Sequence, residues 1–203
     1  MFPTLQQFID GIKGGSGLLF WDDEALDRFD QSISGFWKSF SAPIAAFPAY
    51  MVYVLAGHAA RIEGIANLPD GQTVDALPPT QVFVTAACLT YILGVILFPL
   101  VMIPFTKQLG LTHRFVPFII ARNWINAVVT FLLAAPSLLY LAGVLGPAAT
   151  LGLTMLLSFA AFAGLYFAAL SALQCARLWA VMTVLIDAAI GILFIQLSLA
   201  ILT

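Results

Sequence analysis

One apolar stretch of the chain, residues 115–131, carries polar side chains that a membrane-spanning helix ordinarily lacks. It contains Arg122, Asn123, Asn126 and Thr130 within a run of isoleucine, valine, phenylalanine and alanine. At about 100° per residue, Arg122, Asn126 and Thr130 follow one another along the same side of a helix, with Asn123 beside them. Such a stripe must face protein or water rather than lipid, because lipid offers polar groups no partners.

A second polar group, Asp187, lies inside the last apolar run, with Thr183 on the same side of the helix. A span that begins near residue 178 places this carboxyl about 14 Å deep, since a helix rises about 1.5 Å per residue. At this depth an aspartate is protonated, hydrogen-bonded to a neighbouring helix or paired with a base. Two interpretations stay open, which are a structural interhelical hydrogen bond and part of an ion or proton pathway.

The position of Arg122 depends on where its span enters the hydrocarbon. If the span begins near Trp124, Arg122 snorkels to the headgroups. If it begins near Val116, Arg122 lies about 9 Å deep and needs a partner, because an arginine at depth costs roughly 3 kcal/mol or more. Asp187 would then be about one helical turn away in depth, within reach of the arginine. We predict one intramembrane polar cluster, made of Arg122, Asn123, Asn126, Thr130, Thr183 and Asp187.

The composition is that of a membrane protein. Apolar residues make up 62% of the 203 residues and charged residues only 9%, compared with about 25% charged residues in globular proteins. Several apolar runs exceed the roughly 18 residues that indicate a membrane span. The eight basic residues form no patch, so we expect no nucleic acid partner. Cys88 and Cys175 lack metal-ligand spacing, and we expect no disulfide between them.

The apolar runs predict an all-α, polytopic integral membrane helix bundle, with an amphipathic segment over residues 1–40 and a transmembrane domain over 41–203. The five predicted spans are about 41–60, 80–104, 116–145, 148–172 and 178–201. The third is longer than one perpendicular span needs, so it tilts, bends at Pro136 or begins along the membrane surface. Small residues repeat every four positions in the fourth span and predict a close-packing face of Ala160, Gly164, Ala168 and Ala172.

Two amphipathic stretches precede the first span. Residues 2–12 have the spacing of a short helix in the membrane surface, and Gly14-Gly15-Ser16-Gly17 is expected to end it. A second amphipathic helix is expected from Asp22 to Phe40, as an interfacial helix leading into the first span or as a docking surface for a soluble partner. Its expected apolar face consists of Leu26, Phe29, Ile33, Phe36, Trp37 and Phe40, and its wet side of Asp23, Asp27, Asp30 and Lys38.

The distribution of basic residues predicts the orientation. With five spans and a cytoplasmic N-terminus, seven basic residues lie on the cytoplasmic side and only Arg61 lies outside. The connection 61–79 and the C-terminal Thr203 are then external. No signal peptide or lipidation motif is evident, so we expect the spans to direct insertion into a bacterial-type inner membrane.

Motifs of common enzymes are absent from the sequence, including phosphate-binding loops, H-E-x-x-H, G-x-S-x-G and CxxC. His58 and His113 lie at opposite ends of different predicted spans and cannot form a cluster. We therefore expect no enzymatic activity, no cofactor and no metal site.

An acidic and aromatic segment, Phe29-Asp30 through Gly35-Phe36-Trp37-Lys38-Ser39-Phe40, runs into the first span, and short connections join the last three helices. In these two features the chain resembles the Yip-domain family of five-span membrane proteins and its bacterial relatives. The short motifs of the eukaryotic members are not evident, so no functional residues are transferred. The resemblance implies a five-helix membrane protein that acts through protein or lipid contacts rather than catalysis.

Two functions from different classes are consistent with the sequence. The leading one is a non-enzymatic membrane scaffold or interaction protein, with the lipid bilayer and a membrane-protein partner or a second copy as its contacts. The second is a small transporter or channel subunit that uses the polar cluster around Asp187 and Arg122. A continuous polar cavity reaching Asp187 would favour transport, whereas a dry, tightly packed bundle would favour a scaffold.

Overall fold

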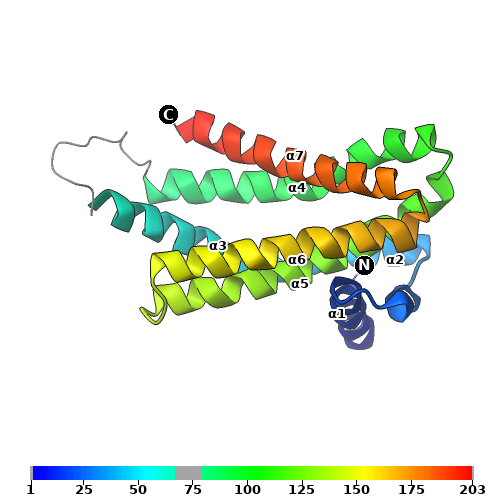
Figure 1. Cartoon of the computed structure of the whole chain (residues 1–203), viewed down its shortest axis with the longest axis horizontal. Coiled ribbons are helices and arrows are strands. Elements are labelled where there is room, and N and C mark those ends of the chain that lie inside the picture. The colour runs from blue at the N-terminus through cyan, green and yellow to red at the C-terminus, as the bar shows by residue number, and fades with distance from the viewer. Residues whose placement is uncertain (1, 67–78, 203) are drawn as a thin grey trace.

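The chain folds as an all-helical bundle, as predicted (Figure 1). A computed structural model describes residues 2–66 and 79–202. Within these residues there are seven α-helices and two 3₁₀ helices, the latter over Asp23–Arg28 and Thr112–Arg114. The α-helices are α1 (Leu5–Leu19), α2 (Ile33–Ser39), α3 (Ser41–Ala66), α4 (Thr80–Gln108), α5 (Phe115–Leu141), α6 (Pro147–Leu173) and α7 (Arg177–Leu202).

Five of the described helices, α3 to α7, are long and apolar enough to cross a membrane, so the chain is a multi-pass membrane protein. Many of their large apolar side chains are exposed, as expected for surfaces that contact lipid. The helices begin close to the predicted positions, but α3 continues to Ala66 and α4 to Gln108. These bounds place both helix ends beyond the apolar cores of their spans.

The predicted end of the third span at residue 145 is wrong, because α5 ends at Leu141. Gly143 adopts a left-handed backbone with φ of 73°, a conformation that glycine reaches without a steric penalty. The N–H of Gly143 donates to the carbonyl of Tyr140, and the next two N–H groups donate to Leu139. These bonds close the helix. Pro136 lies within α5 and does not terminate it.

The five long helices form two groups that converge at one end (Figure 1). In the first group, α5 packs between α3 and α6, and in the second α4 packs against α7. The connections Leu109–Arg114 and Gln174–Ala176 join the groups, and Arg114 donates a hydrogen bond to the Gln174 side chain. We call this end the closed end. The opposite end, where α3 and α5 stop and α4 and α6 begin, is the open end.

The prediction that Gly14–Gly17 breaks the first helix is wrong, since α1 continues through these glycines to Leu19. Thr4 and Gln7 cap its start by donating and accepting reciprocal hydrogen bonds. The glycines are used for close contact instead of a turn. A Cβ atom at Gly15 would lie 2.8 Å from the backbone of Trp124 in α5. Figure 1 shows α1 almost end-on, running across the direction of the five long helices.

The expected continuous helix from Asp22 to Phe40 is also wrong, because a 3₁₀ helix and α2 are separated by an extended segment. Asp30 accepts hydrogen bonds from the N–H and the hydroxyl of Ser32, which hold the pKa of Asp30 below its ordinary value. The break also splits the apolar face. Phe29 is only 8% exposed and joins the core, whereas Ile33 is 65% exposed.

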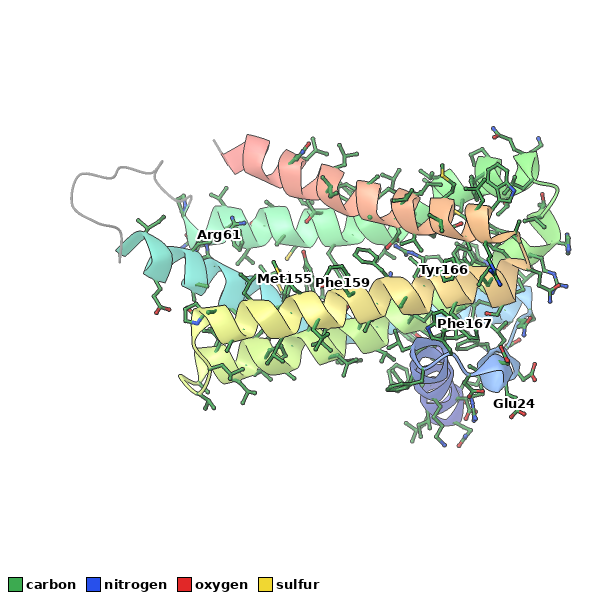
Figure 2. The ribbon with its side chains drawn as sticks, in the orientation of Figure 1. Glu24, Arg61, Met155, Phe159, Tyr166 and Phe167 are labelled. Carbon is green, nitrogen blue, oxygen red and sulfur yellow. The ribbon has the colours of Figure 1, made fainter. Side chains whose placement is uncertain are left out.

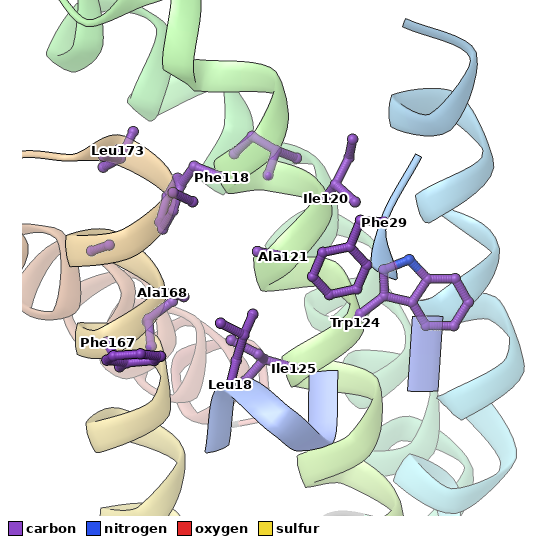
Figure 3. Close-up of a cluster of buried hydrophobic side chains, with 14 of the residues drawn as sticks. Leu18, Phe29, Phe118, Ile120, Ala121, Trp124, Ile125, Phe167, Ala168 and Leu173 are labelled. Carbon is purple, nitrogen blue, oxygen red and sulfur yellow. The ribbon is translucent and has the colours of Figure 1, made fainter. Parts of the chain in front are cut away.

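The buried core lies toward the closed end (Figure 3). Leu18 of α1, Ile125 of α5 and Ala168 of α6 meet there, and all three are fully buried. On the predicted packing face of α6, Gly164, Ala168 and Ala172 are buried, but Ala160 is exposed. Packing is therefore dense toward the closed end, and the two helix groups lie farther apart toward the open end (Figure 1).

Candidate functional site

Arg122 of α5 and Asp187 of α7 form an ion pair inside the bundle. The guanidinium donates from both Nε and one terminal nitrogen to the same carboxylate oxygen, and the Nε distance is 3.0 Å. The side chains are only 8% and 19% exposed. Because α5 and α7 belong to different helix groups, the pair bridges the groups next to the closed end.

A third helix completes the surroundings of the arginine. The guanidinium carbon of Arg122 lies 3.7 Å from the ring centroid of Phe98 in α4, and Phe98 is fully buried. This geometry is that of a cation–π contact, which is strongest where water is excluded. Arg122 is thus held by one carboxylate and one aromatic face, and it does not reach the bundle surface as a snorkelling arginine would.

The other residues of the predicted cluster separate into different roles. Asn123 donates to the hydroxyl of Ser39 at 3.0 Å and so ties α5 to α2. The hydroxyls of Thr130 and Thr183 donate to carbonyl groups one turn earlier in their own helices. Thr183 is fully buried. The structure therefore brings Arg122 and Asp187 together and places Thr183 elsewhere.

A cavity of about 710 Å³ lies between the two helix groups and reaches the ion pair. Arg122 and Asp187 line it toward the closed end, and Arg61 and Tyr140 line it toward the open end. Its apolar walls include Val54, Ala87, Val95, Ala127, Val129, Leu133, Ile190 and Phe194, and its polar walls include Tyr50, Tyr53, Thr90, Tyr91, Asn126, Thr130, Ser137, Thr150 and Thr154. These walls suit an amphipathic molecule better than a hydrated ion.

One flank of the cavity is exposed on the side of the bundle that faces lipid. Leu151 of α6 lines the cavity and is 56% exposed. Met155 and Phe159 continue this exposed apolar strip, and in Figure 2 they project from the side of α6 directed toward α4. A molecule dissolved in the bilayer can therefore approach the cavity between α6 and the second helix group.

Sequence reasoning missed the tyrosines of the cavity wall. The rings of Tyr50 in α3 and Tyr91 in α4 lie 4.4 Å apart between centroids. Their hydroxyls donate across the α3–α4 contact, from Tyr91 to the carbonyl of Pro43 and from Tyr50 to that of Ala87. The available signal was a phenol in the middle of an apolar span, since a buried hydroxyl needs a partner.

His58 of α3 is buried and is not among the residues that line the cavity. It is 5% exposed, its ring stacks on Phe83 at 4.5 Å, and its Nε2 lies 3.3 Å from the Thr80 hydroxyl. Its Nδ1 has no hydrogen-bond partner among the described residues. In that same part of the chain, no group of three or more His, Cys, Asp and Glu side chains is arranged to hold a metal ion.

The chain matches no protein-family model, no curated protein and no solved structure. The resemblance to the Yip-domain family accordingly stays a prediction from the sequence. The functional interpretation rests on the ion pair, the cavity and the helices that form them.

Proposed function

We propose that the protein is a small transporter or carrier for an amphipathic molecule that enters the cavity from the bilayer. The observation that carries this proposal is the cavity of about 710 Å³ that ends on the Arg122–Asp187 pair. The criterion set from the sequence was a polar cavity, whereas this one has mixed and mainly apolar walls, so it is its reach to Asp187 that supports transport over the scaffold interpretation. The mixed apolar and hydroxyl lining supports an amphipathic substrate.

The accessibility of the cavity supports an occupied state. One flank is open, where the lining residue Leu151 is 56% exposed. Molecules from the surroundings can therefore enter the cavity and fill it. The exposed apolar strip on α6 favours a filling molecule that comes from the membrane.

The ion pair has a mechanical role in this proposal. It joins α5 of one group to α7 of the other, and Phe98 of α4 covers the guanidinium. Separation of the two side chains would release the two helix groups from each other. Such a two-state contact is the kind of element that alternating access requires.

A second candidate function is a membrane interaction protein, by itself or as a homo-oligomer. Exposed aromatic and aliphatic side chains of the N-terminal segment favour it, namely Phe20, Trp21, Ile33 and Trp37. In a membrane protein these residues also fit the headgroup region, where aromatic side chains anchor helices. The cavity has no role in this function, so the cavity-filling experiment below distinguishes the two.

The orientation is part of the proposal. The bias of seven basic residues to one supports a cytoplasmic N-terminus in a bacterial-type inner membrane, with the closed end inside and the open end outside. We expect reporter fusions after Asn67 and after Thr203, both outside the described residues, to report the external side. A cytoplasmic signal from the C-terminal fusion would contradict the five-span topology.

A side chain that fills the cavity should weaken the binding of an amphipathic molecule there. Gly191 lines the cavity, and a Cβ atom there meets no atom within 4 Å, so Gly191→Phe can project a ring from a position where the helix has room for a side chain. Gly152 also has open space around it but does not line the cavity. Gly152→Phe is therefore the matched control with the same change in helix propensity.

The measurement is native mass spectrometry of the purified protein with phosphatidylcholine and phosphatidylglycerol of identical acyl chains. We expect Gly191→Phe to reduce total lipid binding about tenfold, the change that corresponds to roughly 1.4 kcal/mol of binding free energy. Gly152→Phe should bind as the parent protein does. Equal binding by both variants would overturn the proposed function.

A further inference from the structure

We infer that the cavity binds an anionic phospholipid, with its phosphate on Arg61 at the open end and an acyl chain directed toward Arg122 and Asp187. This inference rests on the proposed function and specifies the chemistry of its ligand. The inference is drawn from one charged side chain in the cavity wall, which forms no ion pair with any other described residue.

Arg61 is that group. It is exposed, it lines the cavity, and Figure 2 shows it near the end of α3 that lies beside the start of α4. Its guanidinium carbon lies 6.0 Å from the ring centroid of Phe83. The ion pairs of the described residues are Lys38–Asp30 and Arg122–Asp187, so none of their carboxylates pairs with Arg61. A guanidinium fork without a carboxylate partner suits a phosphate.

The neighbouring wall supplies further polar groups for a headgroup. Tyr53, Tyr140 and Thr150 line the cavity, as Arg61 does. The Tyr140 hydroxyl donates to Glu63 at 2.6 Å, and the Thr150 hydroxyl donates to the carbonyl of Gly146 at 3.0 Å. Tyr53 lies eight residues before Arg61 on α3, about 12 Å along the helix, so Arg61 is the group that meets the phosphate and Tyr53 can meet polar groups farther along the lipid.

The length of the cavity along α5 is close to the thickness of a bilayer's hydrocarbon core. Arg122 and Tyr140 are 18 residues apart in α5, and this separation spans about 27 Å at 1.5 Å per residue. The hydrocarbon core of a bilayer is about 30 Å thick. With Arg122 about 9 Å deep, the level of Arg61 and Tyr140 lies about 36 Å from the closed-end boundary, just beyond the hydrocarbon core, where phosphates of the bilayer are found. A lipid can thus keep its phosphate at headgroup depth while a chain enters the cavity.

The charge balance favours an anionic ligand over a cationic one. Among the described residues that line the cavity, Asp187 is the acidic one, and its carboxylate already accepts two bonds from Arg122, so a lipophilic amine would have to compete with the arginine there. It would also add a positive charge next to a buried guanidinium. A phosphate at Arg61 meets an uncompensated positive charge and leaves the buried pair intact.

The test compares phosphatidylglycerol with phosphatidylcholine of the same chains, by native mass spectrometry of the full chain in detergent. The parent protein should prefer phosphatidylglycerol. In Arg61→Gln this preference should fall about tenfold, the size of one charge-assisted hydrogen bond, with phosphatidylcholine binding unchanged. Arg61→Lys should keep part of the preference, and Lys107→Gln at the closed end, with the same change in charge, should keep all of it.

Three results would overturn the inference. They are equal binding of the two lipids by the parent protein, an unchanged preference in Arg61→Gln, and displacement of phosphatidylglycerol by inorganic phosphate alone, which would indicate an anion site without a lipid. In each case a loss of lipid binding in Gly191→Phe would still support the proposed function. If Gly191→Phe has no effect, the cavity itself is not the binding site.

Discussion

Asp187→Asn alone should lower the free energy of unfolding in detergent by about 3–5 kcal/mol, as expected when one partner is removed from a buried ion pair. The guanidinium of Arg122 is 8% exposed and would keep its charge, because arginine does not lose its proton in proteins. The Phe98 ring would remain as a partner, but a cation–π contact contributes only about 0.5–2 kcal/mol. Most of the desolvation cost would therefore stay uncompensated.

Arg122→Gln alone should cost less than Asp187→Asn at neutral pH. An aspartate left in a low-dielectric site can become neutral by taking up a proton, whereas an arginine cannot. The double variant, Arg122→Gln with Asp187→Asn, contains no buried charge at this position. It should recover at least about 1 kcal/mol relative to the sum of the single losses, within the range of coupling energies for residues in contact.

Chemical unfolding in detergent, followed for the parent and the three variants, measures this coupling. Lys38→Gln is the control, because Lys38 pairs with Asp30 at 3.9 Å near the surface, where an ion pair contributes about 0–1 kcal/mol. Additive losses in the double variant would mean that the two side chains do not stabilise each other. A loss in Lys38→Gln as large as in Asp187→Asn would indicate a general effect of charge removal.

The sequence was sufficient to predict the pair because both residues are costly in lipid. Arg122 continues the stripe of Asn126 and Thr130, and Asp187 lies near the middle of the last span however its ends are drawn. Each needs a partner, and the estimated depths differ by about one turn. The one partner of opposite charge at a matching depth was therefore predictable, without knowledge of how the helices are arranged.

The cavity could not be predicted in the same way. It depends on how far α4 and α7 stand from α5 and α6, and helix separation has no direct signature in the apolar pattern. In the sequence, Phe98 and Tyr91 are ordinary apolar or interfacial residues. In the structure, Phe98 lies against the guanidinium of Arg122 and Tyr91 lines the cavity. From the sequence, Arg61 was only the single basic residue of an external connection. Its place in the cavity wall is what makes it the proposed phosphate-binding residue.

The glycines of α1 show a different limit of prediction from the sequence. Gly14-Gly15-Ser16-Gly17 has low helix propensity and therefore predicted a break. Tertiary contact overrides that preference, because the buried glycines let α1 lie directly on α5 beside Trp124. The low helix propensity of glycine therefore gave the wrong prediction, because the contact between α1 and α5 requires glycine, the smallest residue.

Gly15→Ala should therefore destabilise the protein, although alanine favours a helix by about 1 kcal/mol over glycine. The added Cβ would lie 2.8 Å from the carbonyl carbon and oxygen of Trp124 and 3.2 Å from the nitrogen of Ile125. These are backbone atoms of α5, so they cannot move aside as the end of a flexible side chain can. Overpacking of this kind costs typically about 1–3 kcal/mol, so the contact outweighs the gain in propensity.

Gly152→Ala separates the two effects, because a Cβ at Gly152 meets no atom within 4 Å. It should leave the free energy of unfolding unchanged or raise it by up to about 1 kcal/mol, the propensity difference. Limited proteolysis reports the position of α1 directly. Cleavage in α1 should become faster in Gly15→Ala and stay at the parent rate in Gly152→Ala. If Gly15→Ala is as stable and as protease-resistant as the parent, α1 does not depend on this crossing for its position on α5.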